Sequence, residues 1–437
     1  MTRDMSEPAA GARTKIDALF SSPFAMVAAA MAVRLIVMAF VYTSQLDPAQ
    51  DHWAFGCETG RVARSIVTGH GFSSPYDQPT GPTAVLTPVY PYLLAGVFKI
   101  FGIYSTASAL AILTLNNLFS AITCLPLFLI ARSVFGLRVA CWAGWIWAFF
   151  PYSVILSNLW VWETTLTTLL VTLIVLATLR IEGSTSPLAW AGYGLLWGLT
   201  ALTSPAALAT LPLLGIWIWV RHWRRGGNCT GLAAMASLVF LASVAPWVWR
   251  CSQTYGRFVA LRSNFGLEIL VGNSSDSSNP FNWSILPTAG VKNNLSELEE
   301  VIRIGEPAYL AKKSHEAMEL VTQRPLHFAR MTLRRILYTW TAFWDFSARP
   351  WMDDSALPNI LVYSLISFLA WTGLIRAIRD GRPGVFPLAV LLTCFPLVYY
   401  ITHPEIRFRH PIDPMIVILV VYGAMSLRRR AAESPTG

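Results

Sequence analysis

Residues 107–131 read ASALAILTLNNLFSAITCLPLFLIA, a run of 25 residues that contains no charged side chain. About 20 predominantly apolar residues are enough for an α-helix to cross the hydrocarbon core of a bilayer. In lipid, only a helix or a closed barrel satisfies all the hydrogen bonds of its own backbone. The stretch therefore predicts a transmembrane helix, and it guides the interpretation of similar blocks on both sides of it.

Nine other apolar blocks share this character, and together they predict an all-α polytopic membrane protein with about ten transmembrane helices. Of the 437 residues, 54% are hydrophobic and 13% are charged, against about 25% charged residues in a soluble domain. This composition excludes a soluble enzyme, a disordered chain and a disulfide-built secreted domain, and the blocks do not alternate as barrel strands do. The predicted spans are 24–45, 107–131, 138–156, 161–180, 188–203, 205–220, 231–250, 356–376, 384–401 and 411–427.

Lysine and arginine gather at the ends of these blocks, as they do in cytoplasmic loops. Placing those ends inside gives one consistent map, with an N-terminal tail 1–23 and a C-terminal tail 428–437 in the cytoplasm. Because the net charge of +9 comes from these clusters, it predicts no nucleic-acid partner. The six cysteines lack metal-binding spacing, and we interpret them as structural.

The map leaves two large regions on the outer side. One is the first outer loop, 46–106, inside an N-terminal transmembrane catalytic module 24–250. The other is a soluble and juxtamembrane segment, 251–355, followed by C-terminal transmembrane helices 356–427. Within that segment, residues 257–282 look like short strands and turns and residues 295–322 look helical, so we expect a small mixed structure.

Two shorter apolar stretches lie in these outer regions. Residues 88–102 form a helix of about 22 Å at 1.5 Å per residue, and a span there would reverse the signs of all later loops. We therefore expect a juxtamembrane or re-entrant helix on the outer side, and the same for residues 331–346.

Residues 53–68 have the periodicity of an amphipathic helix. Phe55, Thr59, Val62 and Ile66 fall on one stripe, whereas charged residues lie on the other side, so the helix is expected at the membrane surface. Asp47, Asp51 and His52 come just before it. Without further information, these three read equally well as a turn or as a polar cluster at the membrane surface.

Four stretches of this sequence together resemble GT-C-type glycosyltransferases. The first is ETGRVARSIVTGHGF (58–72) with GPTAVLTPVYPYLLA (81–95). The others are residues 151–163, which end the third span and open the fourth with the acid Glu163, residues 325–344, and HPEIRFRHPIDP (403–414). The resemblance is to the polyprenyl-phosphate-sugar-dependent enzymes related to protein O-mannosyltransferases and the lipid A aminoarabinose transferase, glycosyltransferase family 39-like. The sequence departs from many relatives at one point, because Phe55 and Gly56 stand where those carry an adjacent Asp-Glu pair.

The resemblance implies a GT-C-like bundle that transfers a sugar from a polyprenyl-phosphate donor to an acceptor hydroxyl. Such a transfer needs one carboxylate as general base and positive charge for the departing phosphate. We expect Asp51 to be the base, with Glu58 as the alternative, because Asp51 follows the first span directly. The candidate phosphate ligands are Arg61, Arg64, Lys99, Arg407 and Arg409. Arg407 and Arg409 would share a side in an extended loop.

Other polar residues of the outer face are expected to line the cleft. They are Asp47, His52, Glu163, Arg262, Asn264, Glu268 and His403. No dedicated metal-ligand set is visible, although carboxylates near a phosphate could recruit Mg²⁺ or Mn²⁺. The partners implied are the lipid-linked sugar, membrane lipids and an acceptor protein, lipid or glycan.

Structural interpretations stay open for several of these residues. The arginines could anchor lipid headgroups, Glu163 could be an aromatic-belt helix end, and residues 262–273 could be a β-hairpin. Arg34, midway through the first span, should face the bundle interior with a partner.

The competing function is a transporter or flippase of a lipid-linked saccharide, which would favour repeated halves and broken helices at the midplane. The short soluble parts and the family pattern indicate the bacterial plasma (inner) membrane, with the active site on the outer, periplasmic face. An endoplasmic reticulum location stays open.

Overall fold

A computed structural model describes residues 17–41, 55–159, 161–274, 295–344 and 357–433. These residues form helices joined by short loops, with no strand among them and one isolated antiparallel bridge between Ser73 and Pro82. The prediction of an all-α polytopic membrane protein is confirmed. The helices of the first half are α2 (Pro23–Val41), α3 (Glu58–Val67), α4 (Val89–Phe101), α5 (Thr106–Ile122), α6 (Cys124–Phe135), α7 (Leu137–Phe149), α8 (Pro151–Leu159), α9 (Thr164–Ile181), α10 (Pro187–Ala201), η3 (Pro205–Thr210) and α11 (Leu211–Arg224).

The second half contains two long helices that flank the outer segment, and a central C-terminal helix. Its helices are α12 (Thr230–Tyr255), α13 (Phe265–Asn273), α14 (Leu295–Ile304), α15 (Glu306–Gln323), α16 (Pro325–Thr341), α17 (Leu357–Arg379), α18 (Val385–Cys394), α19 (Leu397–Ile401), η6 (Ile406–Phe408), η7 (His410–Ile412) and α20 (Asp413–Glu433).

Every one of the ten predicted spans coincides with helix, but the helices differ in length. Among the described residues, six are long and apolar enough to cross a membrane, and the pair α7 and α8, bent by 42°, makes a seventh. The other three, α10, α11 and α18, have 15, 14 and 10 residues. Helix α4 has 13 residues, about 20 Å at 1.5 Å per residue, which is shorter than the hydrocarbon core.

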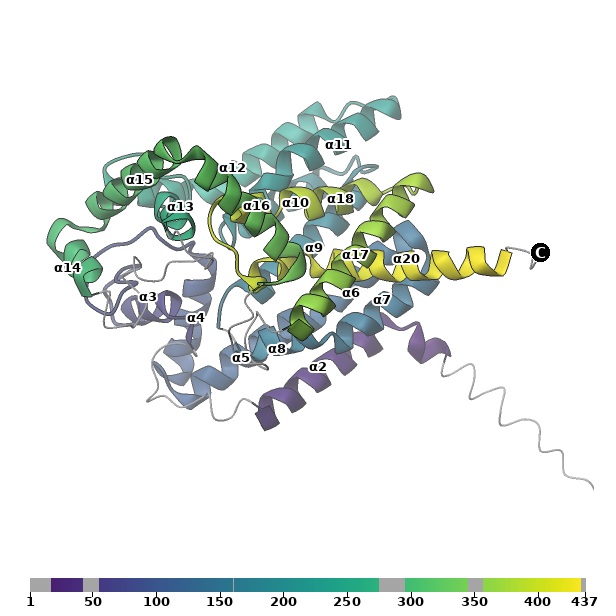
Figure 1. Ribbon diagram of the computed structural model, residues 1–437, viewed down its shortest axis with the longest axis horizontal. Helices are drawn as coiled ribbons and strands as arrows, with labels where there is room; N and C mark the ends of the chain where they lie inside the picture. Colours follow the sequence, from purple (N-terminus) through teal and green to yellow (C-terminus); the bar gives the residue numbers. More distant parts are fainter. Residues whose placement is uncertain (1–16, 42–54, 160, 275–294, 345–356, 434–437) are drawn as a thin grey trace, which may run out of the picture.

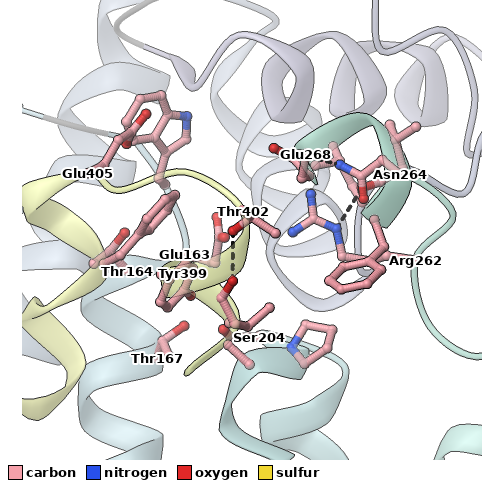
Figure 2. A pocket seen from close by; sticks show the side chains of 18 of the residues that line it. Glu163, Thr164, Thr167, Ser204, Arg262, Asn264, Glu268, Tyr399, Thr402 and Glu405 are labelled. Atoms are coloured by element: carbon pink, nitrogen blue, oxygen red, sulfur yellow. Dashed lines mark hydrogen bonds between the residues drawn. The ribbon is translucent and has the colours of Figure 1, made fainter. Parts of the chain in front are cut away.

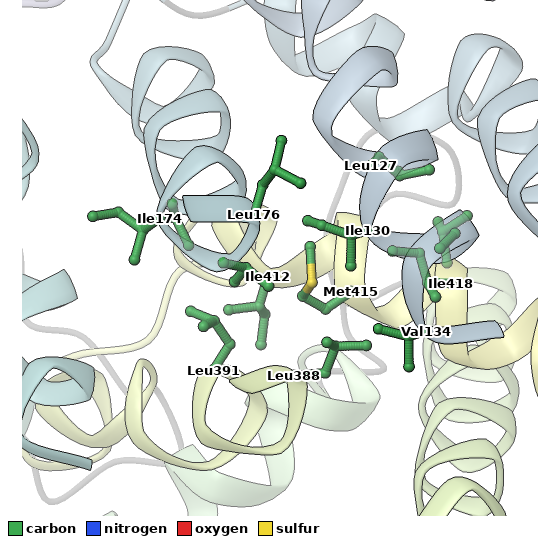
Figure 3. Packing of buried hydrophobic residues seen from close by; sticks show 14 of the residues in the cluster. Leu127, Ile130, Val134, Ile174, Leu176, Leu388, Leu391, Ile412, Met415 and Ile418 are labelled. Carbon is green, nitrogen blue, oxygen red and sulfur yellow. The ribbon is translucent and has the colours of Figure 1, made fainter. Parts of the chain in front are cut away.

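The bundle is built around α20, which other helices surround (Figure 1). Met415, Ile416 and Ile418 of α20 are fully buried. They pack against side chains of α6, α9 and α18, as Figure 3 shows. A helix that is apolar on all sides belongs in the interior of a bundle, and α20 occupies that place.

No strand lies among the described residues of the outer segment, so the short strands expected within 257–274 are not found, and residues 275–282 of that stretch lie outside the described residues. Residues 265–273 form α13. They are part of the stretch 262–273, for which a β-hairpin was the alternative interpretation. Gly266 and Gly272 misled the prediction because glycine often marks a turn. In the structure they allow close packing instead. A Cβ on Gly266 would lie 2.3 Å from Ser314 of α15, and one on Gly272 would lie 1.8 Å from the Thr402 carbonyl oxygen.

The outer elements share a hydrophobic core of their own. Buried side chains of the first loop, including Val62 and Phe72, pack with the end of α12 and with α13 to α15. Figure 1 shows these elements gathered at one end of the bundle, opposite the end from which the C-terminus leaves. This packing places two loops, 83–87 and 260–264, at the end of the bundle that the outer elements cover.

Candidate active site

A cavity of about 490 Å³ lies where the outer elements meet the bundle. The parts of the chain that line it include the start of α3, residues 85 and 86 of the first outer loop, the start of α9, residues 204–208, residues 260–268 and residues 398–411. Figure 2 shows Arg262, Asn264 and Glu268 on one side and Glu163, Thr164, Thr167 and Tyr399 facing them. Its charged and histidine side chains are Glu58, Glu163, Arg262, Glu268, His403, Glu405 and Arg407.

Glycine at position 56 brings the start of α3 against the start of α9. Gly56 has φ 72°, and a Cβ there would lie 2.1 Å from the Val161 carbonyl oxygen. This contact and the positive φ explain why glycine occupies position 56. The contact places Glu58, the first residue of α3, and Glu163, which precedes α9, on the wall of one cavity. The Glu163 side chain makes no capping bond to α9.

Arg407 is held in the cavity wall by aromatic rings and a carboxylate. Its guanidinium carbon lies 3.5 Å from the ring centre of Trp162 and 4.7 Å from that of Phe408, and it forms an ion pair with Glu405. Cation–π contact of this kind holds a guanidinium in a fixed plane. Arg407 is therefore pre-oriented at the cavity, and its role as a phosphate ligand stays a prediction.

Arg409 does not join Arg407, and that part of the prediction is corrected. It is buried, 3.1 Å from Asp413 and 3.1 Å from the Ser367 hydroxyl, and lies over the Tyr363 ring. The predicted shared side assumed an extended loop. The chain instead forms two 3₁₀ turns here, and at three residues per turn side chains two positions apart point in different directions.

Glu268, Asn264 and His403 form one polar group on the opposite wall. The Asn264 amide donates to Glu268 at 2.6 Å, and His403 Nδ1 lies 3.1 Å from the other Glu268 oxygen. Burial alone would raise the pKa of Glu268, but the contact with His403 and the charges of His403, Arg262 and Arg407 outweigh it and lower that pKa below its ordinary value. The carboxylate therefore stays ionised beside two arginines.

Arg262 reaches the same wall from the loop before α13. Its Nε donates to the Val85 carbonyl oxygen at 2.7 Å, and the side chain is half-buried at the cavity. The backbone of Ser263 donates to the Ala84 carbonyl at 2.9 Å. The loops 83–87 and 260–264, which are far apart in the sequence, are thus hydrogen-bonded to each other, and these bonds fix the position of Arg262 at the cavity.

Three predicted phosphate ligands do not line the cavity. Arg61 is fully buried, pairs with Asp77 and also bonds the Pro75 carbonyl. Arg64 is half-buried with its guanidinium over the Tyr104 ring, and Lys99 is exposed at the end of α4. Helix α3 is accordingly packed within the protein on both sides. Ala63 and Ile66 pack against α4, and Arg61, on the side expected to carry the charges, contacts the loop that follows α3.

Asp47, Asp51 and His52 lie outside the described residues, so their predicted roles stay predictions. Among the residues that the structure does describe, no group of three or more His, Cys, Asp or Glu side chains is arranged to hold a metal ion. The described cavity is instead rich in hydroxyl groups that sequence reasoning did not select. Thr167 lies one helical turn after Glu163, which was a usable signal. Tyr399 of α19, Thr402 directly after it and Ser204 before η3 come close to Glu163 only in the fold.

Comparison with known proteins supports the same class of molecule. Residues 79–249 match the family model described as dolichyl-phosphate-mannose-protein mannosyltransferase. No curated protein sequence is significantly similar to the chain.

The fold is shared with the oligosaccharyltransferase of Archaeoglobus fulgidus. Its crystal structure with a tethered acceptor peptide has a TM-score of 0.55 at 13% identity over 93% of this chain and 50% of that one. A complex of the same enzyme with an inhibitory peptide and a dolichol-phosphate gives 0.54 at 15% identity, covering 95% of this chain and 52% of that one. The chain thus spans about half the length of that relative.

A further structure, ArnT from Cupriavidus metallidurans bound to undecaprenyl phosphate, has a TM-score of 0.38 at 13% identity over 92% of this chain and 79% of that one. With the family match and the archaeal fold, the resemblance to GT-C glycosyltransferases predicted from the sequence is confirmed.

Proposed function

We propose that this protein is a membrane glycosyltransferase that moves a sugar from a polyprenyl-phosphate donor to an acceptor hydroxyl. The observation that carries the proposal is the single cavity in which the carboxylates Glu58 and Glu163 face the cations Arg262 and Arg407. Carboxylates suit the activation of a hydroxyl, and arginine forks suit a phosphate. The family match over residues 79–249 supports the same chemistry.

The cavity belongs on the outer face of the membrane in this proposal. Glu163 lies at one end of α9, and Arg180 and Glu182 lie at its other end, where Arg221 and Arg225 bind Glu182. Helix α9 has 18 residues, about 27 Å at 1.5 Å per residue, which nearly equals the hydrocarbon core. Since basic loops stay in the cytoplasm, the cavity end faces outward, in keeping with a bacterial plasma membrane.

The chemistry then requires one proton transfer and one displacement. The acceptor hydroxyl gives its proton to a carboxylate, its oxygen forms a bond to the anomeric carbon, and the bond from that carbon to the phosphate oxygen breaks. The electron pair leaves with the lipid phosphate, whose negative charge Arg407 and Arg262 stabilise. We keep Asp51 as the proposed base, with Glu58 as the alternative, and Glu163 as a polar group that orients the sugar or acceptor.

The sugar donor can be identified without knowing it in advance. In a strain that lacks the gene, lipid mass spectrometry should reveal an accumulated prenyl-phosphate sugar that disappears when the wild-type gene is restored. The accumulated lipid names the sugar, and its disappearance reports activity in the native membrane.

The same strain tests the base. Asp51→Asn should fail to clear the accumulated lipid, and Glu58→Gln should clear it more slowly than wild type. The control is Glu299→Gln, which changes an exposed carboxylate in the middle of α14 and should behave as wild type. All variants must reach the membrane at equal levels. A strain that accumulates no prenyl-phosphate sugar would refute the enzyme proposal, and a fully active Asp51→Asn beside a dead Glu58→Gln would exchange the two roles.

A further inference from the structure

Glu306 is a buried acid that the proposed chemistry does not use. It is the first residue of α15 and is 1% exposed. One carboxylate oxygen accepts hydrogen bonds from the Thr83 hydroxyl at 2.8 Å, from the Ala84 amide at 3.2 Å and from the Tyr255 hydroxyl. The other oxygen is buried without a hydrogen bond in the described structure. A buried acid in such a place needs a reason.

The bonds of Glu306 lead to the cavity through the backbone of the first outer loop. Thr83 and Ala84 are followed by Val85, whose carbonyl holds Arg262 Nε at 2.7 Å, and the Thr83 hydroxyl accepts from the Val85 amide at 3.2 Å. The second route runs through Tyr255, which accepts from the Ser263 hydroxyl at 2.9 Å. Both routes end at the loop that carries Arg262.

Glu306 itself does not reach the cavity, because it is absent from the cavity wall that Arg262 and Val85 form. Arg250 of α12 holds the same backbone stretch from the bundle side, since it donates to the carbonyls of Thr83 and Phe72. The hydrogen bonds of Glu306 and Arg250 therefore connect α12, α15 and the first outer loop at residues 83–85. The Val85 carbonyl of this stretch accepts the hydrogen bond from Arg262.

We infer that Glu306 is a positioning residue: by holding the backbone at Thr83 and Ala84 it fixes Val85 and thereby sets the place of the Arg262 guanidinium in the cavity. The inference rests on the proposed function, in which Arg262 contacts the donor phosphate. The role needs an oxygen acceptor at this position rather than a negative charge. Burial raises the pKa of Glu306 above its ordinary value, only partly opposed by the hydrogen bonds from Tyr255, Thr83 and Ala84 and by the charge of Arg250, which agrees with a role that needs no charge.

The test measures binding of undecaprenyl phosphate to the purified protein in detergent, together with turnover of the lipid-linked sugar found in the deletion strain. Arg262→Ala should weaken binding roughly ten-fold or more, as loss of a charge-assisted hydrogen bond does. Glu306→Ala should weaken it by a smaller factor, raising the apparent KM for the donor more than it lowers kcat. Glu306→Gln, which keeps the acceptor oxygen, should restore near wild-type binding.

A double-variant cycle separates positioning from general damage. In the Arg262→Ala background, Glu306→Ala should cause no further loss of binding, because the group that it positions is gone. Thr83→Val removes the hydroxyl that links Glu306 to Val85 with little change of shape, and it should show the same dependence on Arg262 if Glu306→Ala does not fold.

Two results would overturn the inference: losses that multiply in the double variant, or a Glu306→Gln variant that folds normally and is as impaired as Glu306→Ala. If the wild-type protein neither turns over the lipid-linked sugar nor binds undecaprenyl phosphate, the proposed function fails, and that outcome is distinct from the other two.

Discussion

Arg407 and Arg409 show how different two residues of one short motif can be. Arg407 lines the cavity against Trp162, whereas Arg409 is buried with Asp413. The two arginines look equivalent in the sequence motif, but Arg407 belongs to the cavity and Arg409 has a structural role.

We expect alanine at these two positions to give opposite profiles. Arg407→Ala should fold and raise the apparent KM for the lipid-linked sugar roughly ten- to a hundred-fold, since each lost charge-assisted bond is worth about 1.5–3 kcal/mol. Arg409→Ala should lower the Tm and the yield instead, because breaking a buried ion pair costs about 3–5 kcal/mol. Kinetics and thermal unfolding of both variants, with exposed Arg257→Ala as the control, check the assignment. Normal stability of Arg409→Ala together with impaired donor kinetics would return Arg409 to the cavity.

Several cavity residues were predictable because the sequence marks them as polar groups on the outer side of apolar blocks. Glu163, Arg262, Asn264, Glu268, His403 and Arg407 were found in this way, and all line the cavity. Arg61 and Arg64 were misplaced because their partners, Asp77 and Tyr104, stand 16 and 40 positions away, and nothing in the local pattern shows such contacts. Charge predicts a face of the membrane, but it does not reveal which charges are already paired.

Helices were predictable as elements, whereas their contacts were not. Period and block length located the apolar helices, yet they gave no sign that α10 and α12 touch backbone to backbone. A Cβ on Gly194 would lie 2.1 Å from the Ala236 carbonyl oxygen, whereas Gly192, half a turn away on the same helix, has nothing within 4 Å. Small residues allow such close helix pairs in membranes. The same glycine reasoning, applied to α13, explains why a hairpin was expected where a helix formed.

These two glycines make a matched pair for a stability measurement. Gly194→Ala should lower the Tm in detergent, because forcing atoms into a packed interface typically costs about 1–3 kcal/mol. Gly192→Ala should leave the Tm unchanged or raise it, since alanine is favoured over glycine in a helix by about 1 kcal/mol. If both variants unfold at the wild-type temperature, α10 and α12 do not pack as described.

At the scale of the whole molecule, the described outer elements gather at one end, and the proposed orientation puts that end outside the cell. Single cysteines in a background without the six native ones test this in intact cells. Gln78→Cys, Lys99→Cys and Glu299→Cys, all at exposed positions, should react with an impermeant thiol reagent, whereas Arg224→Cys should react only after permeabilisation. Because Gln78 precedes α4 and Lys99 lies in its last turn, labelling of only one of them from outside would mean that α4 crosses the membrane and that the map of spans is wrong.

Hydropathy located the apolar helices, and the basic residues predict the side on which each loop lies, so the sequence carries much of the architecture. It carries less of the three-dimensional arrangement. That α20 lies at the centre depends on how the buried faces of α6, α9 and α18 complement one another, which no periodicity expresses. The outer core shared by the first loop and by α13 to α15 has the same origin, since its partners are more than 150 residues apart.

The arginine of the first span has a consequence for synthesis in the cell. Arg34 is fully buried and donates to the hydroxyls of Ser120 and Ser153 and to the carbonyl of Ala148, at the bend between α7 and α8. Ser153 is 119 positions downstream, which a ribosome adding roughly 5–20 residues per second reaches after about 6–24 s. During that time the partners of Arg34 on α7 and α8 have not been made, so the first helix carries a charge that lipid disfavours until they emerge.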